Sequence, residues 1–274
     1  MYPIRAIVLL TLLSLSAYAV DSPSRQYFVT SDNIKIRYID QGQGSPVVLI
    51  HGYNLPAEDN WVSNGIVAAL AKNHRVVALD LRGHGLSEKP HDAAHYGDRI
   101  WMDVIELMDR LSIEKAHFHG YSMGGSVMTE LLVRHPERFI TAIYGGCGVP
   151  EIDPVWIRKV PPNTDATDPQ DAEALAKFRA PSPVRDEEAL TALRAALPGK
   201  ADKTIDLTAL AIPVLLINGE FDKLNSNSHR LQREVKDFQC VVLPGKSHLT
   251  AIMKDYIPAL YAESLLKFID ANDE

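Results

Sequence analysis

The amino-acid sequence predicts an α/β protein built on one mainly parallel β-sheet. Two observations lead to this prediction: continuous apolar runs such as residues 45–52 and 75–80, and nearby segments with apolar side chains at helical spacing. Strands that alternate with helices are joined by right-handed crossovers, which place them parallel in one sheet. The composition agrees, because 46% of the 274 residues are hydrophobic and 23% are charged, enough to bury a sizeable core.

The first part of the chain contains most of the expected strands. It begins with a β-hairpin, because two short strand-like stretches flank the turn residues Asp32 and Asn33. Segments of helical periodicity separate the later strands, and Pro136 ends the third of these segments. The expected strands are residues 27–30, 34–40, 45–52, 75–80, 115–122 and 139–148, and the expected helices are residues 61–73, 96–111 and 125–135.

The alternation stops at residue 149 and resumes after residue 211. The stretch between them holds eight of the 17 prolines and no buried-strand run, although two segments have helical character. These segments are residues 170–179 and 185–197; beyond them we expect a strand over 212–219, a helix over 227–236, a strand over 238–245 and a closing helix over 255–270.

We interpret residues 149–211 as a small helical cap inserted into one core domain, which comprises residues 20–148 and 212–274. The alternative is a linker between two domains, but a block of about 60 residues after the insertion is too short to form its own core. In open α/β sheets, ligands bind outside the carboxyl ends of the strands. An insertion that follows such a strand end is therefore expected to cover the ligand-binding crevice.

The first 19 residues have the pattern of a secretory signal peptide. One basic residue, Arg5, precedes an apolar run that leads to Ala17-Tyr18-Ala19, a small-x-small cleavage pattern. The alternative is an N-terminal membrane anchor, but the apolar run falls short of the roughly 20 residues that a spanning helix needs. We expect cleavage after Ala19 and an exported protein, periplasmic or secreted, with no stable membrane anchor.

The charge and the cysteine content argue against several classes of partner and site. A net charge of −7 and an isoelectric point near 5.8 argue against nucleic-acid binding. The sequence has no metal-ligand spacing and no phosphate-binding glycine loop, so we expect no metal and no cofactor. Cys147 and Cys240 are too few for a disulfide framework, and we expect two buried free thiols. The oligomeric state is left open.

A serine lies between two glycines where a predicted strand meets a predicted helix, in Gly120-Tyr121-Ser122-Met123-Gly124. This is the pattern of a nucleophile elbow, a strained turn that lifts the serine hydroxyl clear of the sheet. A side chain at either glycine would collide with the neighbouring strand or helix. The turn also points the first free N–H groups of the next helix toward a bound carbonyl oxygen. Ser122 is therefore the expected nucleophile.

A serine hydroxyl needs a base to activate it, and the base needs an orienting acid. In this architecture the acid and then the histidine follow the serine along the chain. Asp222 and His248 each follow one of the last two predicted strands, so both are expected at the same rim of the sheet as Ser122. Asp153, after the preceding strand, is the alternative acid.

These motifs resemble those of the α/β-hydrolase fold family. The chain carries His51-Gly52-Tyr53 after one strand and DLRGHGLS, residues 80–87, after the next. The resemblance covers roughly residues 27–148 and 212–270, and it implies a mostly parallel eight-stranded sheet with helices on both faces and a small helical cap. One departure is Asn54, where many relatives have proline. The site residues that the resemblance implies are the nucleophile Ser122, the base His248, the acid Asp222, and an oxyanion hole formed by the backbone N–H groups of Tyr53 and Met123.

The serine narrows the reaction that the resemblance implies. Relatives that open epoxides or displace halide use aspartate at the elbow, whereas a serine with a histidine base attacks acyl carbons. We expect a carboxylesterase-like serine hydrolase for small or medium neutral esters, with Tyr121 and Trp156 in contact with the substrate. The alternatives are C–C bond hydrolysis, hydrolysis of thioesters, amides or lactones, cofactor-free perhydrolysis, and a non-catalytic ligand-binding protein.

Overall fold

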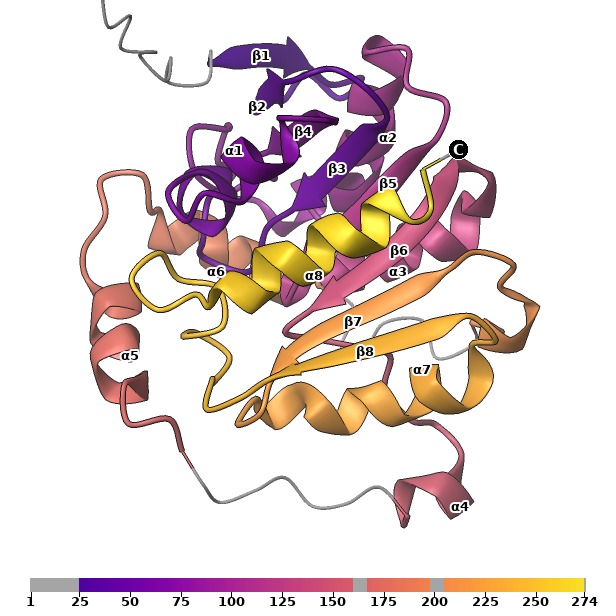
Figure 1. The fold of residues 1–274 in the computed structure, drawn as a ribbon. Helices are drawn as coiled ribbons and strands as arrows, with labels where there is room; N and C mark the ends of the chain where they lie inside the picture. The colour runs from indigo at the N-terminus through magenta and orange to yellow at the C-terminus, as the bar shows by residue number, and fades with distance from the viewer. Residues whose placement is uncertain (1–24, 160–166, 198–204, 274) are drawn as a thin grey trace, which may run out of the picture.

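A single eight-stranded sheet organises the chain in the computed structural model (Figure 1). The structure describes residues 25–159, 167–197 and 205–273. Across the sheet the strands follow the order β1-β2-β4-β3-β5-β6-β7-β8. The strands are β1 Gln26–Val29, β2 Lys35–Gln41, β3 Pro46–Ile50, β4 Arg75–Leu79, β5 Ala116–Tyr121, β6 Phe139–Gly145, β7 Val214–Gly219 and β8 Phe238–Leu243.

The sheet is antiparallel at one edge and parallel elsewhere. β1 and β2 form the expected hairpin, in which the N–H of Thr30 donates to the carbonyl of Ile34 at 2.9 Å and Asn33 takes a left-handed φ of 66°. β2 also pairs antiparallel with β4, and all other neighbouring strands are parallel. The predicted mostly parallel α/β sheet is confirmed, and its long crossovers bring the carboxyl ends of six strands to one rim.

Helices cover both faces of the sheet, and each face has its own hydrophobic core. Along β3, Val48 and Ile50 belong to one core and Val47 and Leu49 to the other, because side chains alternate between the faces of a strand. The first core contains side chains of α2, α3 and α7, and the second contains those of α1 and α8. Figure 1 shows α8 crossing the front of the sheet, with α3 behind it. These helices are α1 Ile66–Leu70, α2 Arg99–Arg110, α3 Met123–Arg134, α7 Ser228–Glu234 and α8 Ala259–Asp270.

Two helices differ most clearly from their predicted bounds. The segment predicted as one helix over 61–73 is divided into η1 Glu58–Val62 and α1, because Gly65 takes a left-handed φ of 85° between them. The closing helix begins at Ala259 and not at residue 255, since Pro258 precedes it in an extended conformation with a ψ of 149°. Both differences arise from a single residue that ends or starts a helix.

The stretch predicted as a cap insertion is largely helical in its described residues. α6 packs onto the core through the buried side chains of Leu190 and Leu193, whereas the side chain of Trp156 in α4 is 39% exposed. In Figure 1 α5 lies on the opposite side of the view from α4. The cap boundaries at residues 149 and 211 stay a prediction. The elements of this stretch are α4 Pro154–Ile157, α5 Asp171–Arg179, α6 Glu187–Ala196 and η4 Leu207–Ala209.

The expected signal peptide, residues 1–19, lies outside the described residues. Within the part of the chain that the structure describes, no helix is long and apolar enough to cross a membrane. Export and cleavage after Ala19 therefore stay predictions.

The two cysteines have different environments. Cys147 is buried and Cys240 is exposed, and both are free thiols. The expectation that Cys240 is buried was wrong, because β8 is the last strand at one edge of the sheet and most of its side chains are left partly or fully exposed.

Candidate active site

Ser122 lies at the turn between β5 and α3 in a backbone conformation that few residues adopt. Its φ is 52° and its ψ is −114°, outside the regions in which a residue with a Cβ is comfortable. Its N–H donates to the carbonyl of Gly145 in β6 at 2.8 Å, and α3 begins at the next residue. Such strain costs about 1–3 kcal/mol and is found mainly where the surroundings enforce it, often at functional sites. The backbone has the geometry of a nucleophile elbow.

The glycines on either side of Ser122 are required by close backbone contacts. A Cβ on Gly120 would lie 2.4 Å from the carbonyl oxygen of Gly124, and a Cβ on Gly124 would lie 2.1 Å from the carbonyl oxygen of Ile50. Real Cβ atoms do not approach oxygen so closely. The spacing Gly-x-Ser-x-Gly therefore follows from the packing of α3 against β5 and β3.

The structure brings Ser122, His248 and Asp222 together in one hydrogen-bonded chain. His248 Nε2 lies 3.0 Å from Ser122 Oγ, and His248 Nδ1 lies 2.8 Å from Asp222 Oδ2. Because a carboxylate only accepts, Nδ1 carries the proton, and Nε2 has the lone pair that receives the hydrogen bond of the serine hydroxyl. The arrangement is able to move a proton from Ser122 to His248 while Asp222 fixes the imidazole and balances its charge.

The alternative acid, Asp153, lies elsewhere. Its carboxylate caps α4 by accepting a hydrogen bond from the N–H of Val155 at 2.7 Å. Asp222 has a side chain that is only 1% exposed, whereas that of His248 is 33% exposed. The geometry thus favours Asp222 as the orienting acid.

The loop after β3, which carries the expected oxyanion donor Tyr53, is fixed by hydrogen bonds to two other segments. The N–H of Gly52 donates to Asn60 Oδ1 at 2.8 Å. The buried ring of His51 lies 2.8 Å from the carbonyl of Gly52 through Nδ1 and accepts from the N–H of Leu81 at 2.9 Å through Nε2. Burial lowers the pKa of His51 to about 4, so the ring stays neutral and keeps both bonds.

The two expected oxyanion donors belong to segments that adjoin Ser122. A Cβ on Gly52 would lie only 3.3 Å from Ser122 Cβ, so the residue before Tyr53 is in direct proximity to Ser122. Met123 is the first residue of α3, and the first N–H groups of a helix have no partner within it. Asn54, the residue that departs from the family pattern, takes a left-handed φ of 60°. Asparagine tolerates this conformation better than most residues do.

Tyr121, expected to contact the substrate, has a different place in the structure. Its side chain is 1% exposed and packs edge-to-face against Trp61, with ring centroids 6.4 Å apart. Its hydroxyl donates to the backbone carbonyl of His248. Burial raises the pKa of Tyr121 well above its usual range, which keeps the hydroxyl protonated as a donor. The expectation of substrate contact was wrong, because the side chain at this end of β5 faces the core.

Trp156, the other expected substrate contact, also lies away from the three residues of the chain Ser122–His248–Asp222. It lines a separate cavity of about 280 Å³ with residues of α7, and none of those three residues lines that cavity. Its indole ring lies under the Lys159 ammonium, 4.3 Å from Nζ, and under the guanidinium of Arg233 at 4.9 Å. Figure 1 shows α4 at the bottom of the molecule, near α7 and far from α5. Sequence reasoning placed the whole insertion over the site, whereas α4 is directed away from it.

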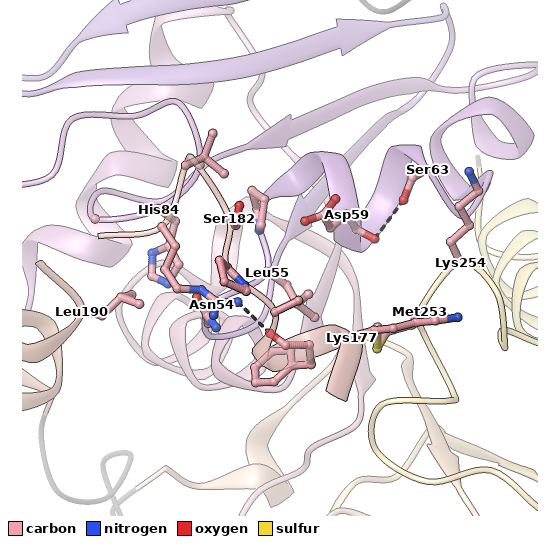
Figure 2. A pocket seen from close by; sticks show the side chains of 18 of the residues that line it. Asn54, Leu55, Asp59, Ser63, His84, Lys177, Ser182, Leu190, Met253 and Lys254 are labelled. Atoms are coloured by element: carbon pink, nitrogen blue, oxygen red, sulfur yellow. Dashed lines mark hydrogen bonds between the residues drawn. The ribbon is translucent and has the colours of Figure 1, made fainter. Parts of the chain in front are cut away.

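A larger pocket of about 410 Å³ lies between the loop after β3 and the cap (Figure 2). It begins at Asn54, one residue beyond Tyr53, and extends to Met253 in the segment before α8. In Figure 2 the side chains of His84 and Leu190 lie at one end and those of Met253 and Lys254 at the other. Neither Ser122 nor His248 lines this pocket; His248 and Asp222 line a smaller one of about 310 Å³.

Comparison with known proteins identifies the family. A sequence model of the alpha/beta hydrolase fold matches residues 45–204, which is more than half of the chain. The chain belongs to the α/β-hydrolase fold family. The chain is 35% identical over 144 residues to 2-hydroxymuconate semialdehyde hydrolase of Pseudomonas sp. strain CF600, a match that covers 50% of each chain. The matched region thus spans about half the length of that relative.

Solved structures of other α/β-hydrolases show the same fold over most of the chain. A thermophilic esterase from Thermogutta terrifontis superposes with a TM-score of 0.72 and 23% identity, covering 92% of this chain and 100% of the esterase. The enol-lactonase from Burkholderia xenovorans LB400 gives a TM-score of 0.71 and 24% identity, covering 89% and 100%. At these identities the likeness establishes the fold only.

Several residues that shape the site had no recognisable signal in the sequence. Asn60 and Tyr121 contribute single hydrogen bonds to the loops that carry Tyr53 and His248. Asp168 and Asp171, in the cap, hydrogen-bond to the residues that flank His248. Each acts through one contact between segments far apart in the chain, and no spacing rule reveals such contacts. In the described residues no group of three or more histidine, cysteine, aspartate or glutamate side chains is arranged to hold a metal ion.

Proposed function

We propose that this α/β-hydrolase is a serine hydrolase that cleaves carboxylic esters through an acyl-enzyme. The observation that supports the proposal is the hydrogen-bonded chain from Ser122 through His248 to Asp222, at distances of 3.0 and 2.8 Å, on a strained turn between strand and helix. A base within hydrogen-bond reach of a serine, itself oriented by a buried carboxylate, is the arrangement that activates a hydroxyl at neutral pH.

In the proposed reaction, Ser122 Oγ attacks the acyl carbon while its proton passes to His248 Nε2. The carbonyl oxygen becomes an oxyanion and receives hydrogen bonds from the backbone N–H groups of Tyr53 and Met123. The carbon–oxygen bond to the alcohol then breaks, and His248 returns its proton to the leaving oxygen. Water repeats the sequence on the acyl-enzyme, which releases the acid and restores the serine.

We further propose that the pocket of about 410 Å³ receives part of the substrate. Its volume is in the usual range of small-molecule sites, roughly 300–1,000 Å³. Apolar side chains line much of it, and its charged residues, Asp59, Lys177, Arg185, Lys254 and Asp255, are of both signs. Burial lowers the pKa of His84 to about 3, which keeps that ring uncharged. These features support a small or medium neutral ester. The apolar lining consists of Leu55, Pro56, Phe178, Ala180, Pro181, Val184, Leu190 and Met253.

The second candidate is hydrolysis of a carbon–carbon bond. It is supported by the 35% identity to 2-hydroxymuconate semialdehyde hydrolase over half of the chain. Thioester, amide, lactone and perhydrolysis reactions use the same three residues, so the geometry of the triad does not separate them. The choice depends on the substrate that the pocket accepts.

A panel of p-nitrophenyl esters with acyl chains of increasing length tests the proposal directly. We expect turnover of the shorter esters and a loss of kcat by about 10⁴- to 10⁶-fold in Ser122→Ala, because the three residues act as a unit. A dienoate ring-fission product, assayed in parallel, decides the alternative. Faster turnover of that compound than of every ester would replace the ester proposal with carbon–carbon hydrolysis.

A further inference from the structure

The turn that carries His248 is closed by a reciprocal pair of hydrogen bonds. The N–H of Ser247 donates to Thr250 Oγ1 at 2.8 Å, and the N–H of Thr250 lies 3.3 Å from Ser247 Oγ. His248 and Leu249 are the two residues between them. Each hydroxyl therefore accepts from the backbone of the other residue, as in a helix capping box. The conformation of this turn depends on both side chains.

Each of the two hydroxyl protons is donated to a carboxylate of the cap. A hydroxyl has one proton to donate. Thr250 Oγ1 donates to Asp168 Oδ2, and Ser247 Oγ donates to Asp171 Oδ1 at 2.5 Å. Asp171 is the first residue of α5, and Asp168 lies three residues before it. The start of α5 is thus attached to the residues immediately before and two positions after His248.

The contact with Asp168 is buried, which makes it costly to break. Asp168 is 4% exposed, Thr250 is 0% and Ser247 is 5%. The second oxygen of Asp168 accepts from the N–H of Gln170 at 2.8 Å, and no cation pairs with this carboxylate in the described part of the chain. A buried carboxylate without a counter-ion is stabilised by the hydrogen bonds it accepts, so loss of one partner is strongly unfavourable.

The histidine is consequently held from two directions. Tyr121 of β5 donates to the backbone carbonyl of His248 from the core, and the cap carboxylates hold the hydroxyls on either side of it. We propose that Asp168 and Asp171 are positioning residues for His248, so that the start of α5 forms part of the support of the catalytic base. This inference rests on the proposed function, in which His248 takes the proton of Ser122.

The consequence concerns the rate of the chemical step. If the turn relaxes, Nε2 moves from its place 3.0 Å from Ser122 Oγ, and a displacement of about 1 Å is able to cost up to about 100-fold in rate. The pocket of about 410 Å³ that is proposed to receive the substrate is not lined by Asp168, Asp171, Ser247 or Thr250. Asp171 and Ser247 line the smaller pocket beside His248, whereas Asp168 and Thr250 line neither of the two. A change in positioning should therefore lower kcat and leave KM nearly unchanged.

The experiment compares Thr250→Val, Thr250→Ser and Asp168→Asn with the full wild-type chain. Valine keeps the shape of threonine but lacks the hydroxyl, whereas serine retains the hydroxyl. Asparagine supplies one acceptor oxygen where Asp168 uses two. We expect kcat for p-nitrophenyl acetate to fall by about 10- to 100-fold in Thr250→Val and Asp168→Asn, with KM within about twofold of wild type. Thr250→Ser should restore most of the rate.

Glu173→Gln is the matched control. Glu173 is an acidic residue of the same helix whose side chain is 65% exposed and paired with Lys177, and it does not contact the turn at His248. It should leave kcat and KM unchanged. Circular dichroism verifies folding. If Thr250→Val does not fold, Ser247→Ala, which removes the link to Asp171 and the acceptor for the N–H of Thr250, is judged by the same criterion.

A fluorophosphonate probe separates this inference from the proposed function. Labelling of Ser122 in the wild-type protein tests the nucleophile, because the probe needs an activated serine and no particular ester. With wild type labelled, slower labelling of the folded variants supports the inference. Wild-type rates in those variants, or a loss confined to KM, would overturn it and leave the function intact. Absence of labelling in wild type would overturn the proposed function itself.

Discussion

The phenolic hydroxyl of Tyr121 donates a hydrogen bond to the backbone carbonyl of His248. Tyr121 is the residue immediately before Ser122, so the same strand end places Ser122 and holds the loop of His248. The ring centroids of Tyr121 and His248 are 5.4 Å apart, which adds a packing contact to the hydrogen bond. Serine and histidine are separated by 126 positions in sequence, and Tyr121 fixes one relative to the other.

Tyr121→Phe removes this hydrogen bond and keeps the packed ring. The carbonyl of His248 then loses a buried donor, and we expect kcat to fall by about 3- to 30-fold because Nε2 is less well aligned. The free energy of unfolding should fall by about 1–2 kcal/mol. Steady-state kinetics and urea denaturation measure the two effects.

Tyr144→Phe is the control for that variant. Tyr144 is also a buried tyrosine, and its hydroxyl lies 3.1 Å from Thr129 Oγ1 of α3 and not at the loop of His248. Its loss should reduce stability by a similar amount, about 1 kcal/mol, and leave kcat unchanged. Equal effects of both variants on kcat would show that Tyr121 acts only through stability.

Asp222→Asn should lower kcat by about 10³- to 10⁴-fold, because the imidazole loses its orienting acceptor and the charge that stabilises its protonated form. Asp153→Asn should be nearly neutral, since that carboxylate only caps the short helix α4. Measurement of kcat for the two variants with the same ester shows which of the two aspartates is the orienting acid. The reverse result would move the acid to the loop after β6.

The strands and helices, and the proximity of Ser122, His248 and Asp222, were predictable because their signals are local. Gly120 and Gly124 are required because a Cβ at these positions would lie 2.4 Å and 2.1 Å from a backbone oxygen, and such a requirement leaves a fixed spacing in the sequence. The alternation of buried strands and helices likewise follows from short-range periodicity. Asp222 and His248 follow the last two strands, so the rim they share could be predicted from the parallel topology.

The positions of Tyr121 and Trp156 were not predictable by the same means. Tyr121 is adjacent to Ser122 in sequence, but its side chain is turned into the core by the alternation of β5. Trp156 belongs to a short helix whose direction depends on residues of α7, such as Arg233, far along the chain. The path of an insertion is set by a few long-range contacts, and these have no periodicity.

Export is the prediction that the described residues leave untested. We expect the mature protein to begin at Val20 or within a few residues of it, since Ala17-Tyr18-Ala19 fits the small-x-small cleavage pattern. N-terminal sequencing of the protein from its native host, with separate recovery of periplasm and cytosol, measures this. Retention of Met1 in a cytosolic fraction would contradict it.

Stability should fall as the pH drops below neutrality, because several buried histidines are neutral in the folded state. Burial lowers the pKa of His51 and His119 to about 4 and that of His84 to about 3, whereas the unfolded value is about 6.5. Between roughly pH 6.5 and 4 the unfolded chain therefore binds more protons than the folded chain. For each extra proton, the free energy of unfolding decreases by about 1.4 kcal/mol for every unit by which the pH is lowered.

One buried acid opposes this trend, and one variant tests it. Burial raises the pKa of Asp103 to about 6, so this group binds a proton in the folded state first and contributes the opposite sign. Because three histidines bind protons on unfolding and only this one acid releases one, unfolding should still show a net uptake of protons near pH 5. Urea denaturation at pH 7, 6 and 5 should show the decline, and His119→Gln should reduce its slope by about one proton. A stability that stays constant from pH 7 to 5 would show that these histidines are already protonated in the folded protein.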